Sequence, residues 1–125
     1  MNKQWIFDTN EFFFKEIVQN GKRIEARVPD FTVPRKHYHK IKSGDSIVVR
    51  LVNKNLEPVS GVEPLIFEVL FNKKYDSIEK LLENEGFKNV MPNMQSSEEA
   101  IQYFYTLPGI GERVKENGVC AIYFR

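Results

Sequence analysis

The stretch Asn20-Gly21-Lys22-Arg23-Ile24-Glu25-Ala26-Arg27-Val28 decides how the rest of the chain is interpreted. Across residues 24–28 apolar side chains alternate with Glu25 and Arg27, and this period of two predicts a strand with one buried face. The other face carries Arg23, Glu25 and Arg27, which place one carboxylate between two guanidinium groups. Glycine tolerates positive φ, so Asn20-Gly21 predicts a sharp turn that holds Lys22 at the start of the strand.

Two interpretations of this charged face stay open from the residues alone. Alternating charges are common on solvated strand faces, where surface ion pairs contribute about 0–1 kcal/mol to stability. A binding or catalytic site needs Lys22 and Glu25 to lie on the same side. Residues three apart point to opposite faces of a regular strand, so they converge only if the turn at Gly21 or a bulge rotates Lys22 inward.

The run Lys22-x-x-Glu25-x-Arg27, followed by Gly44-Asp45, resembles the ASCH family of the PUA-like superfamily. Members carry a Gly-x-Lys-x-x-Glu-x-Arg strand and then a Gly-Asp pair, and residues 116–124 resemble their closing Gly-Val strand. This chain departs from the pattern, because Asn20 stands where the glycine is usual and Gly21 is displaced by one. The resemblance implies an α+β fold built on a small PUA-like β-barrel of about five or six strands, with helices packed outside.

Length and composition narrow the class of protein. With 125 residues and 42% hydrophobic content, we expect a single domain over residues 1–125. The net charge of +1 means that any nucleic-acid contact must come from a local patch. One cysteine excludes an internal disulfide, and no apolar run approaches the ~20 residues of a membrane span. We therefore expect a soluble, cytoplasmic protein that needs no cofactor.

Local patterns predict the other elements. Strands are expected at residues 4–7, 46–52, 65–71 and 119–124, from runs of β-branched and aromatic residues. Capping-box patterns predict that helices begin at Asp8 with Glu11, at Asp76 with Glu79 and at Ser96 with Glu99. Residues 112–117 are interpreted as a short polar connection that leads to the last strand.

The most basic segment of the chain spans residues 35–42, Arg-Lys-His-Tyr-His-Lys-Ile-Lys. Cations beside Tyr38 suit phosphate contact together with one stacked base, although a solvated loop explains the segment equally well. His37 and His39 lack a carboxylate or thiol at zinc-site spacing, so no metal site is predicted. Tyr103 and Tyr105 flank the apolar stripe of the last predicted helix, and at least one of them is expected to point away from the core.

The resemblance suggests what the charged strand does. Family members are proposed to bind RNA in a cleft lined by the motif lysine, glutamate and arginine, here Lys22, Glu25 and Arg27. One branch hydrolyses N(4)-acetylcytidine with a lysine, a threonine and a helix glutamate. In this chain those positions match Lys22, Glu25 in place of the threonine, and Glu85 or Glu83. A third alternative, metal-independent RNA cleavage, would pair Lys22 with His37 or His39.

We therefore predict recognition of RNA or of a modified nucleoside, with hydrolysis of an acylated nucleoside as the alternative. If the protein is an enzyme, the predicted catalytic residues are Lys22, Glu25 and Glu85. The predicted nucleic-acid-binding residues are Lys22, Arg23, Glu25, Arg27, Arg35, Lys36, His37, Tyr38, Lys40 and Tyr105.

Overall fold

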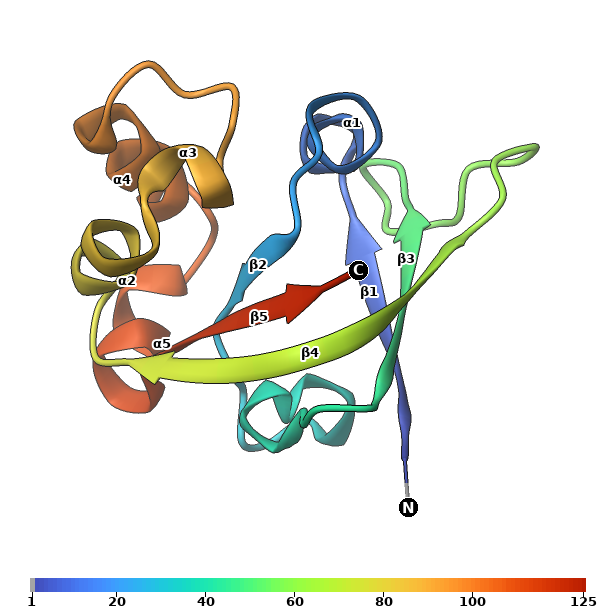
Figure 1. Ribbon diagram of the computed structural model, residues 1–125, viewed down its shortest axis with the longest axis horizontal. Helices are drawn as coiled ribbons and strands as arrows, with labels where there is room; N and C mark the ends of the chain where they lie inside the picture. Colours follow the sequence, from blue (N-terminus) through green and yellow to red (C-terminus); the bar gives the residue numbers. More distant parts are fainter. Residues whose placement is uncertain (1) are drawn as a thin grey trace.

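A curled five-stranded sheet and a separate layer of helices make up the α+β fold of the computed structural model, which describes residues 2–125 (Figure 1). The elements in chain order are β1 (Gln4–Thr9), α1 (Glu11–Asn20), β2 (Ile24–Arg27), two 3₁₀ turns (Pro34–Lys36 and Tyr38–Lys40), β3 (Ser46–Leu51), β4 (Leu65–Tyr75), α2 (Ile78–Glu85), α3 (Phe87–Val90), α4 (Ser97–Tyr105), α5 (Ile110–Asn117) and β5 (Val119–Phe124).

The strands lie in the order β1-β3-β4-β5-β2, so the two N-terminal strands form the two edges of the sheet. β1 pairs with β3 in parallel, and the other neighbours are antiparallel. The long strand β4 bends across the sheet and has a register shift between Val69 and Phe71. The sheet curls into a half-barrel, which confirms the predicted barrel in its coarse form. The half-barrel does not close.

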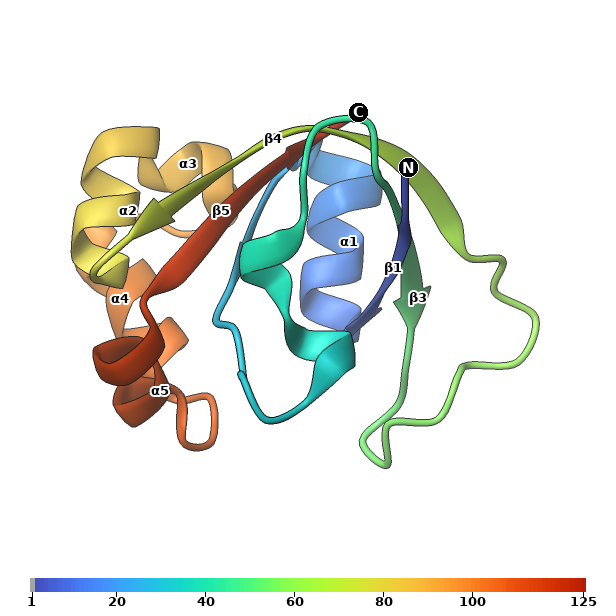
Figure 2. The same cartoon turned by 90° about the horizontal axis from the view of Figure 1, so that it is seen from below.

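Helix α1 lies in the mouth of the curl, between β1 and β2 (Figure 2). It joins the two edge strands directly, and its buried Ile17 belongs to the apolar cluster inside the curl. The side chain of Asn10 accepts a hydrogen bond from Phe13 N and caps this helix. The predicted cap at Asp8 was wrong: Asp8 belongs to β1 and accepts a hydrogen bond from Arg50 instead.

Two apolar clusters meet on opposite faces of β5. Cys120, Ile122 and Phe124 face the inside of the curl, whereas Val119 and Ala121 face the layer formed by α2–α5. A strand covered on both faces reads as a continuous apolar run, which is the pattern of residues 119–124. This arrangement places β2, the neighbour of β5, at the boundary between the sheet and the helical layer.

The remaining helix predictions divide into two groups. Ser77 and Ser96 accept hydrogen bonds from Lys80 N and Glu99 N, so the predicted helices α2 and α4 begin close to their expected positions. The short helix α3 and the helix α5 were not predicted. Residues 112–117 therefore form helix and not a polar connection. None of the helices within residues 2–125 is both long and apolar enough to cross a membrane.

Candidate functional site

Strand β2 turns its charged face inward. Ile24 and Val28 pack against the helical layer, while Glu25 and Arg27 lie opposite Ile122 and Cys120, on the face directed into the curl. Only 5% of Glu25 is exposed. The alternating pattern therefore reflects a strand covered on both sides, by helices on its apolar face and by the half-barrel on its charged face. The solvated-face interpretation is wrong for Glu25.

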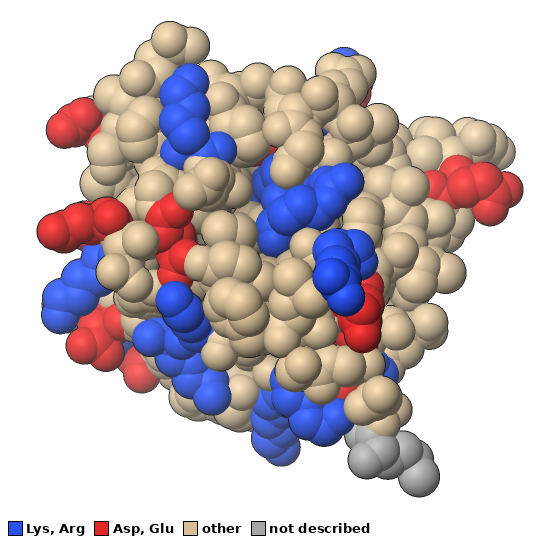
Figure 3. All heavy atoms as spheres, in the orientation of Figure 1, with Lys and Arg blue, Asp and Glu red and all other residues tan. Residues whose placement is uncertain are grey.

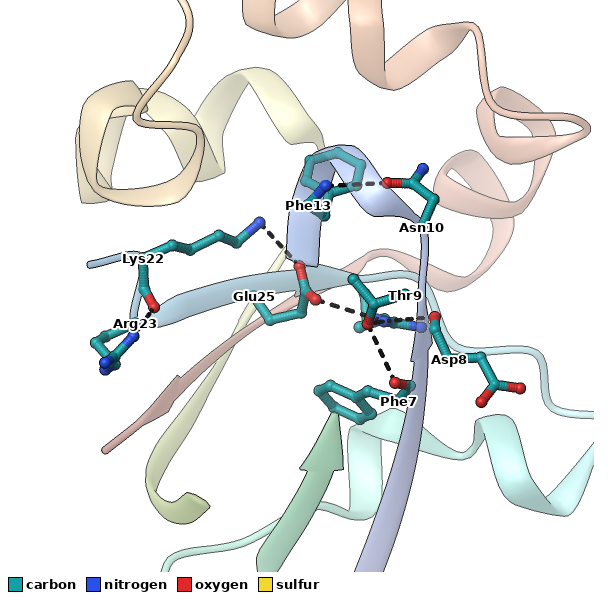
Figure 4. Close-up of polar contacts among 9 residues, drawn as sticks. Phe7, Asp8, Thr9, Asn10, Phe13, Lys22, Arg23 and Glu25 are labelled. Carbon is teal, nitrogen blue, oxygen red and sulfur yellow. Dashed lines mark hydrogen bonds and ion pairs between the residues drawn. The ribbon is translucent and has the colours of Figure 1, made fainter. Parts of the chain in front are cut away.

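Lys22 and Glu25 converge, and the turn at Gly21 is the reason. Gly21 ends α1 in the left-handed conformation, with φ at 69°, so Lys22 precedes the strand and escapes its alternation. The Nζ of Lys22 lies 3.0 Å from Oε1 of Glu25 and 4.4 Å above the centre of the Phe13 ring. Figure 4 shows the lysine reaching across to the carboxylate. Only 2% of Lys22 is exposed, so this ion pair is buried.

Arg27 links the two edges of the sheet. Its Nη2 atom lies 3.4 Å from Oε2 of Glu25 and donates a hydrogen bond of 3.1 Å to the carbonyl of Asp8 on β1. The same nitrogen is 3.4 Å from the hydroxyl of Thr9, and the guanidinium lies 4.5 Å from the centre of the Phe7 ring. A single side chain thus spans the gap between β2 and β1 where a closed barrel would have a further strand pairing.

The charges in this cluster stabilise one another. Burial alone would raise the pKa of Glu25, but the positive charges of Lys22 and Arg27 and their hydrogen bonds outweigh it and lower this pKa below its ordinary value. Burial likewise acts to lower the pKa of Arg27, and Glu25 overcomes it and raises that pKa. The carboxylate and the guanidinium are consequently both charged at neutral pH.

A second buried carboxylate lies near this cluster. Glu16, on α1, is fully buried, and neither of its carboxylate oxygens has a hydrogen-bond partner among residues 2–125. Burial raises its pKa to about 7, Lys22 opposes that rise and Glu25 adds to it. Near neutral pH this side chain is therefore divided between its neutral and charged forms.

The cluster opens onto a cavity of about 240 Å³ between the half-barrel and the helical layer. Its polar wall consists of charged and polar side chains from β1, β2 and the 3₁₀ turns, together with Arg113 of α5. Its apolar wall comes from α1 and from the chain that follows α2. The residues that line it are Asp8, Thr9, Asn10, Phe13, Lys22, Glu25, Ala26, Arg27, Val28, Lys36, Tyr38, Met91, Phe104, Leu107, Ile110 and Arg113.

The backbone of Ala26 adds a further pair of polar groups. Phe124 N donates to Arg23 O, and antiparallel pairs alternate between bonded and non-bonded types, so Ala26 and its partner Ala121 form a non-bonded pair. The N–H and C=O of Ala26 consequently point away from β5, toward the open edge of the sheet. Since Ala26 lines the cavity, this edge places a donor and an acceptor next to the Glu25 carboxylate.

Several predicted residues lie in or beside the cavity. Lys36 and Tyr38 line it, which brings part of the basic segment next to Arg27. Arg35 lies in an adjoining groove. Arg23 turns away from the cavity, because its Nη1 donates to the carbonyls of Ile17 and Lys22.

The other predicted residues lie elsewhere. The Nε2 atom of His37 is 2.9 Å from the carbonyl of Phe31, and Lys40 is exposed at the end of the second 3₁₀ turn. The hydroxyl of Tyr105 donates to Glu79 on the helical layer. Glu85 accepts a hydrogen bond from Tyr75 and lies 3.8 Å from Lys73, and it does not line the cavity. Exposed Glu83, the alternative to Glu85, does not line it either.

Sequence reasoning missed two sets of cavity residues. Asp8, Thr9 and Asn10 come from the junction of β1 and α1, where a strand ending in polar residues is a weak signal that a site is near. Met91, Phe104, Leu107, Ile110 and Arg113 come from a region without any such signal. Among residues 2–125, no three histidine, cysteine or acidic side chains are grouped in a way that could hold a metal ion.

No protein-family model and no curated protein matches the chain. Among solved structures, hypothetical protein PH0355 is 30% identical, with a TM-score of 0.72 over 98% of this chain and 97% of that one. Protein PF0455 from Pyrococcus furiosus is 28% identical, with a TM-score of 0.65 over 98% of this chain and 96% of that one. The half-barrel and its helical layer are therefore shared with proteins of nearly the same length.

Proposed function

We propose that the cavity beside β2 binds a nucleobase, either in RNA or in a modified nucleoside. The chain belongs to the same family as hypothetical protein PH0355. The proposal includes the assignment of this family to the ASCH proteins of the PUA-like superfamily. The observation that carries it is the buried, charged carboxylate of Glu25 at the wall of a closely sized cavity.

The chemistry of the cavity matches the edge and the faces of a base. Glu25 accepts hydrogen bonds, as carboxylates do from the exocyclic amine of cytosine, and Arg27 and the Ala26 N–H donate them. Phe13 and Phe104 offer ring faces and edges to a planar ligand. Bases held by proteins in single-stranded RNA are commonly bound by this combination of aromatic contact and edge recognition.

The size and charge of the cavity argue against larger or simpler ligands. Pockets for drug-sized molecules measure roughly 300–1,000 Å³, so about 240 Å³ suits one base with part of its sugar. A bare phosphate would meet the negative charge of Glu25 next to the two cations. A ligand that donates a hydrogen bond to this carboxylate, by contrast, is attracted by its negative charge.

Calorimetric titration of the protein with cytidine, N(4)-acetylcytidine, adenosine, guanosine and uridine, and with a short single-stranded RNA, tests the proposal. We expect one or more of these to bind, with an affinity that Glu25→Gln lowers by about 10–100-fold, the effect of losing a hydrogen bond to a charged group. Glu68→Gln, at a well-exposed position on β4, is the matched control and is expected to bind normally. Absence of binding at millimolar concentrations, or equal binding by Glu25→Gln, would overturn the proposal.

Hydrolysis of an acylated nucleoside is a second candidate, favoured by one observation. Lys22 and Glu25 converge at 3.0 Å, as that activity requires, and Thr9 adds a hydroxyl to the same cavity. That hydroxyl already donates to the carbonyl of Phe7, and Glu85 lies outside the cavity, so binding is the function with more support. Incubation with N(4)-acetylcytidine tests hydrolysis, and cytidine release abolished by Lys22→Met would establish it.

A further inference from the structure

A groove next to the cavity is lined by several positively charged side chains. It measures about 630 Å³ and runs along β1 beside the 3₁₀ turns, which Figure 2 shows facing that strand. Its charged lining residues are Lys3, Arg27, Arg35, Lys36 and Arg50, with Asp8 as the one acidic residue. Since the whole chain carries a net charge of only +1, the groove is a local concentration of cations.

These cations are largely available to a ligand. Asp8 is neutralised by Arg50, whose Nε lies 2.8 Å from its carboxylate. Within residues 2–125, Lys3, Arg35 and Lys36 form no ion pair within 4.0 Å. On the face drawn in Figure 3, lysines and arginines form separate groups, several of them next to acidic side chains. Lys36 does act on Asp30, whose pKa is lowered by hydrogen bonds from Thr32 and further by the charges of Arg113 and Lys36. Three cations in one groove without a direct ion pair still suit a polyanion.

The groove and the cavity adjoin each other. Asp8, Arg27, Lys36 and Tyr38 line both of them, so Arg27 and Tyr38 form part of the boundary between the two spaces. A base that occupies the cavity would leave its sugar and phosphate at this boundary, beside Lys36. The neighbouring phosphates of a strand would then continue along the groove toward Arg35 and Lys3.

We propose that this groove binds the phosphate backbone of a single-stranded nucleic acid whose unstacked base lies in the cavity, so that the ligand is a strand and not a free nucleoside. The proposal rests on the proposed function, because the cavity must hold the base. A duplex does not fit this arrangement, since its bases stay stacked and paired. The groove determines affinity and the path of the strand, while Glu25 and Ala26 select the base.

Fluorescence anisotropy with a labelled single-stranded RNA of about eight nucleotides, over a series of salt concentrations, tests the groove. The double variant Lys3→Gln/Arg35→Gln removes two cations that form no ion pair with any residue in the described part of the chain. We expect it to bind RNA about 10-fold more weakly at 0.1 M salt and to reduce the log–log salt slope by roughly 1.4, about 0.7 per lost phosphate contact. The affinity for a free nucleoside is expected to stay unchanged.

The matched control is Lys54→Gln/Lys74→Gln, which removes the same charge from exposed positions outside the groove. Equal weakening by both double variants, or RNA binding no tighter than nucleoside binding, would overturn the groove proposal and leave the cavity proposal intact. Binding of a labelled polyglutamate peptide as tightly as RNA would also overturn the groove proposal, because the groove would then be a site for acidic protein segments. If Glu25→Gln binds both RNA and nucleoside normally, the cavity proposal fails, and the strand assignment fails with it.

Discussion

Glu25 and Asp45 are both buried carboxylates with lowered pKa values, yet different kinds of group hold their charges. Asp45 precedes β3 and accepts hydrogen bonds from the backbone N–H groups of Lys3 and Lys42 and from the indole of Trp5. The ammonium of Lys42 lies 2.9 Å from the same carboxylate. Burial opposes this charge, but the hydrogen bonds outweigh burial and lower the pKa of Asp45 to about 2.

Among the residues that the structure describes, the carboxylate of Glu25 is held by two side chains, Lys22 and Arg27, and it lines a cavity. Asp45 lines neither that cavity nor the basic groove. A carboxylate surrounded by backbone donors fastens segments of chain together, here the start of β1 to the turn before β3. A carboxylate held by side chains alone can exchange a partner for a ligand. The comparison separates a structural acid from the acid that we propose binds a ligand, and four variants test it.

Asp45→Asn is expected to have the largest effect. The carboxamide presents a donor to a site built entirely of donors, so we expect the free energy of unfolding at pH 7 to fall by about 4 kcal/mol. Urea denaturation followed by circular dichroism measures it. Ligand affinity measured below the unfolding transition should stay unchanged, and a loss of affinity in the folded variant would contradict the structural role.

Glu25→Gln is expected to lower the free energy of unfolding by roughly 3–4 kcal/mol, because it leaves the buried ammonium of Lys22 without its counter-charge. Adding Lys22→Met removes that charge as well, and most of the stability should return while ligand binding does not. Urea denaturation and calorimetric titration on the same samples measure the two quantities. Recovery of binding in the double variant would show that Glu25 acts only as a structural partner.

Glu16→Gln tests a buried carboxylate that has no hydrogen-bond partner among residues 2–125. Its folded-state pKa of about 7 lies above the ordinary value of 4.5, so its contribution favours folding below pH 4.5 and is lost as pH rises through 7. At pH 8 the wild-type protein carries a penalty of up to about 3 kcal/mol that the variant lacks.

We therefore expect the free energy of unfolding of Glu16→Gln, relative to that of the wild-type protein, to be higher at pH 8 than at pH 4. Urea midpoints across this range measure the difference. Glu25 and Asp45 have lowered pKa values, so their contributions are present above the ordinary pKa and are lost as pH falls, in the opposite direction. A gain from Glu16→Gln that does not change with pH would rule out titration of Glu16 as its source.

Arg27→Lys is expected to have the smallest effect and to lower the free energy of unfolding by about 1 kcal/mol. Lysine keeps the charge beside Glu25 but loses the planar group that lies over Phe7 and reaches Asp8 O on β1. The shift of the thermal midpoint measures it. Arg125→Lys, at an exposed position, is the control and should stay within about 0.5 kcal/mol of wild type.

Much of the fold follows from local patterns. The strands at residues 46–52 and 119–124 and the helices after Ser77 and Ser96 were predicted closely, because their apolar period and caps lie within single segments. Helix α5 was missed, because Ile110 and Val114 are its only buried residues and Gly109 and Gly111 suggest a flexible loop. Packing of these two residues against the rest of the helical layer stabilises the helix, although its local sequence favours helix only weakly.

The candidate site could be predicted only in part. Lys22, Glu25 and Arg27 were identified because they lie within six residues on one strand and its turn. Thr9 and the apolar wall from Met91 to Ile110 were missed, since no local pattern relates them to β2. Glu85 was placed in the site by resemblance alone, and the fold positions it against Tyr75, at the end of β4.

The sequence by itself determined the strands, the helices α1, α2 and α4, the turn at Gly21 and the identity of the charged residues around β2, since each depends on neighbours along the chain. Only the tertiary structure decided that the charged face of β2 points inward and that a cavity and a basic groove adjoin it. Burial depends on what covers a surface, and here β1, the 3₁₀ turns and the C-terminal helices cover it from distant parts of the chain. A period of two indicates that a strand has two different faces, but it does not indicate which face is exposed to solvent.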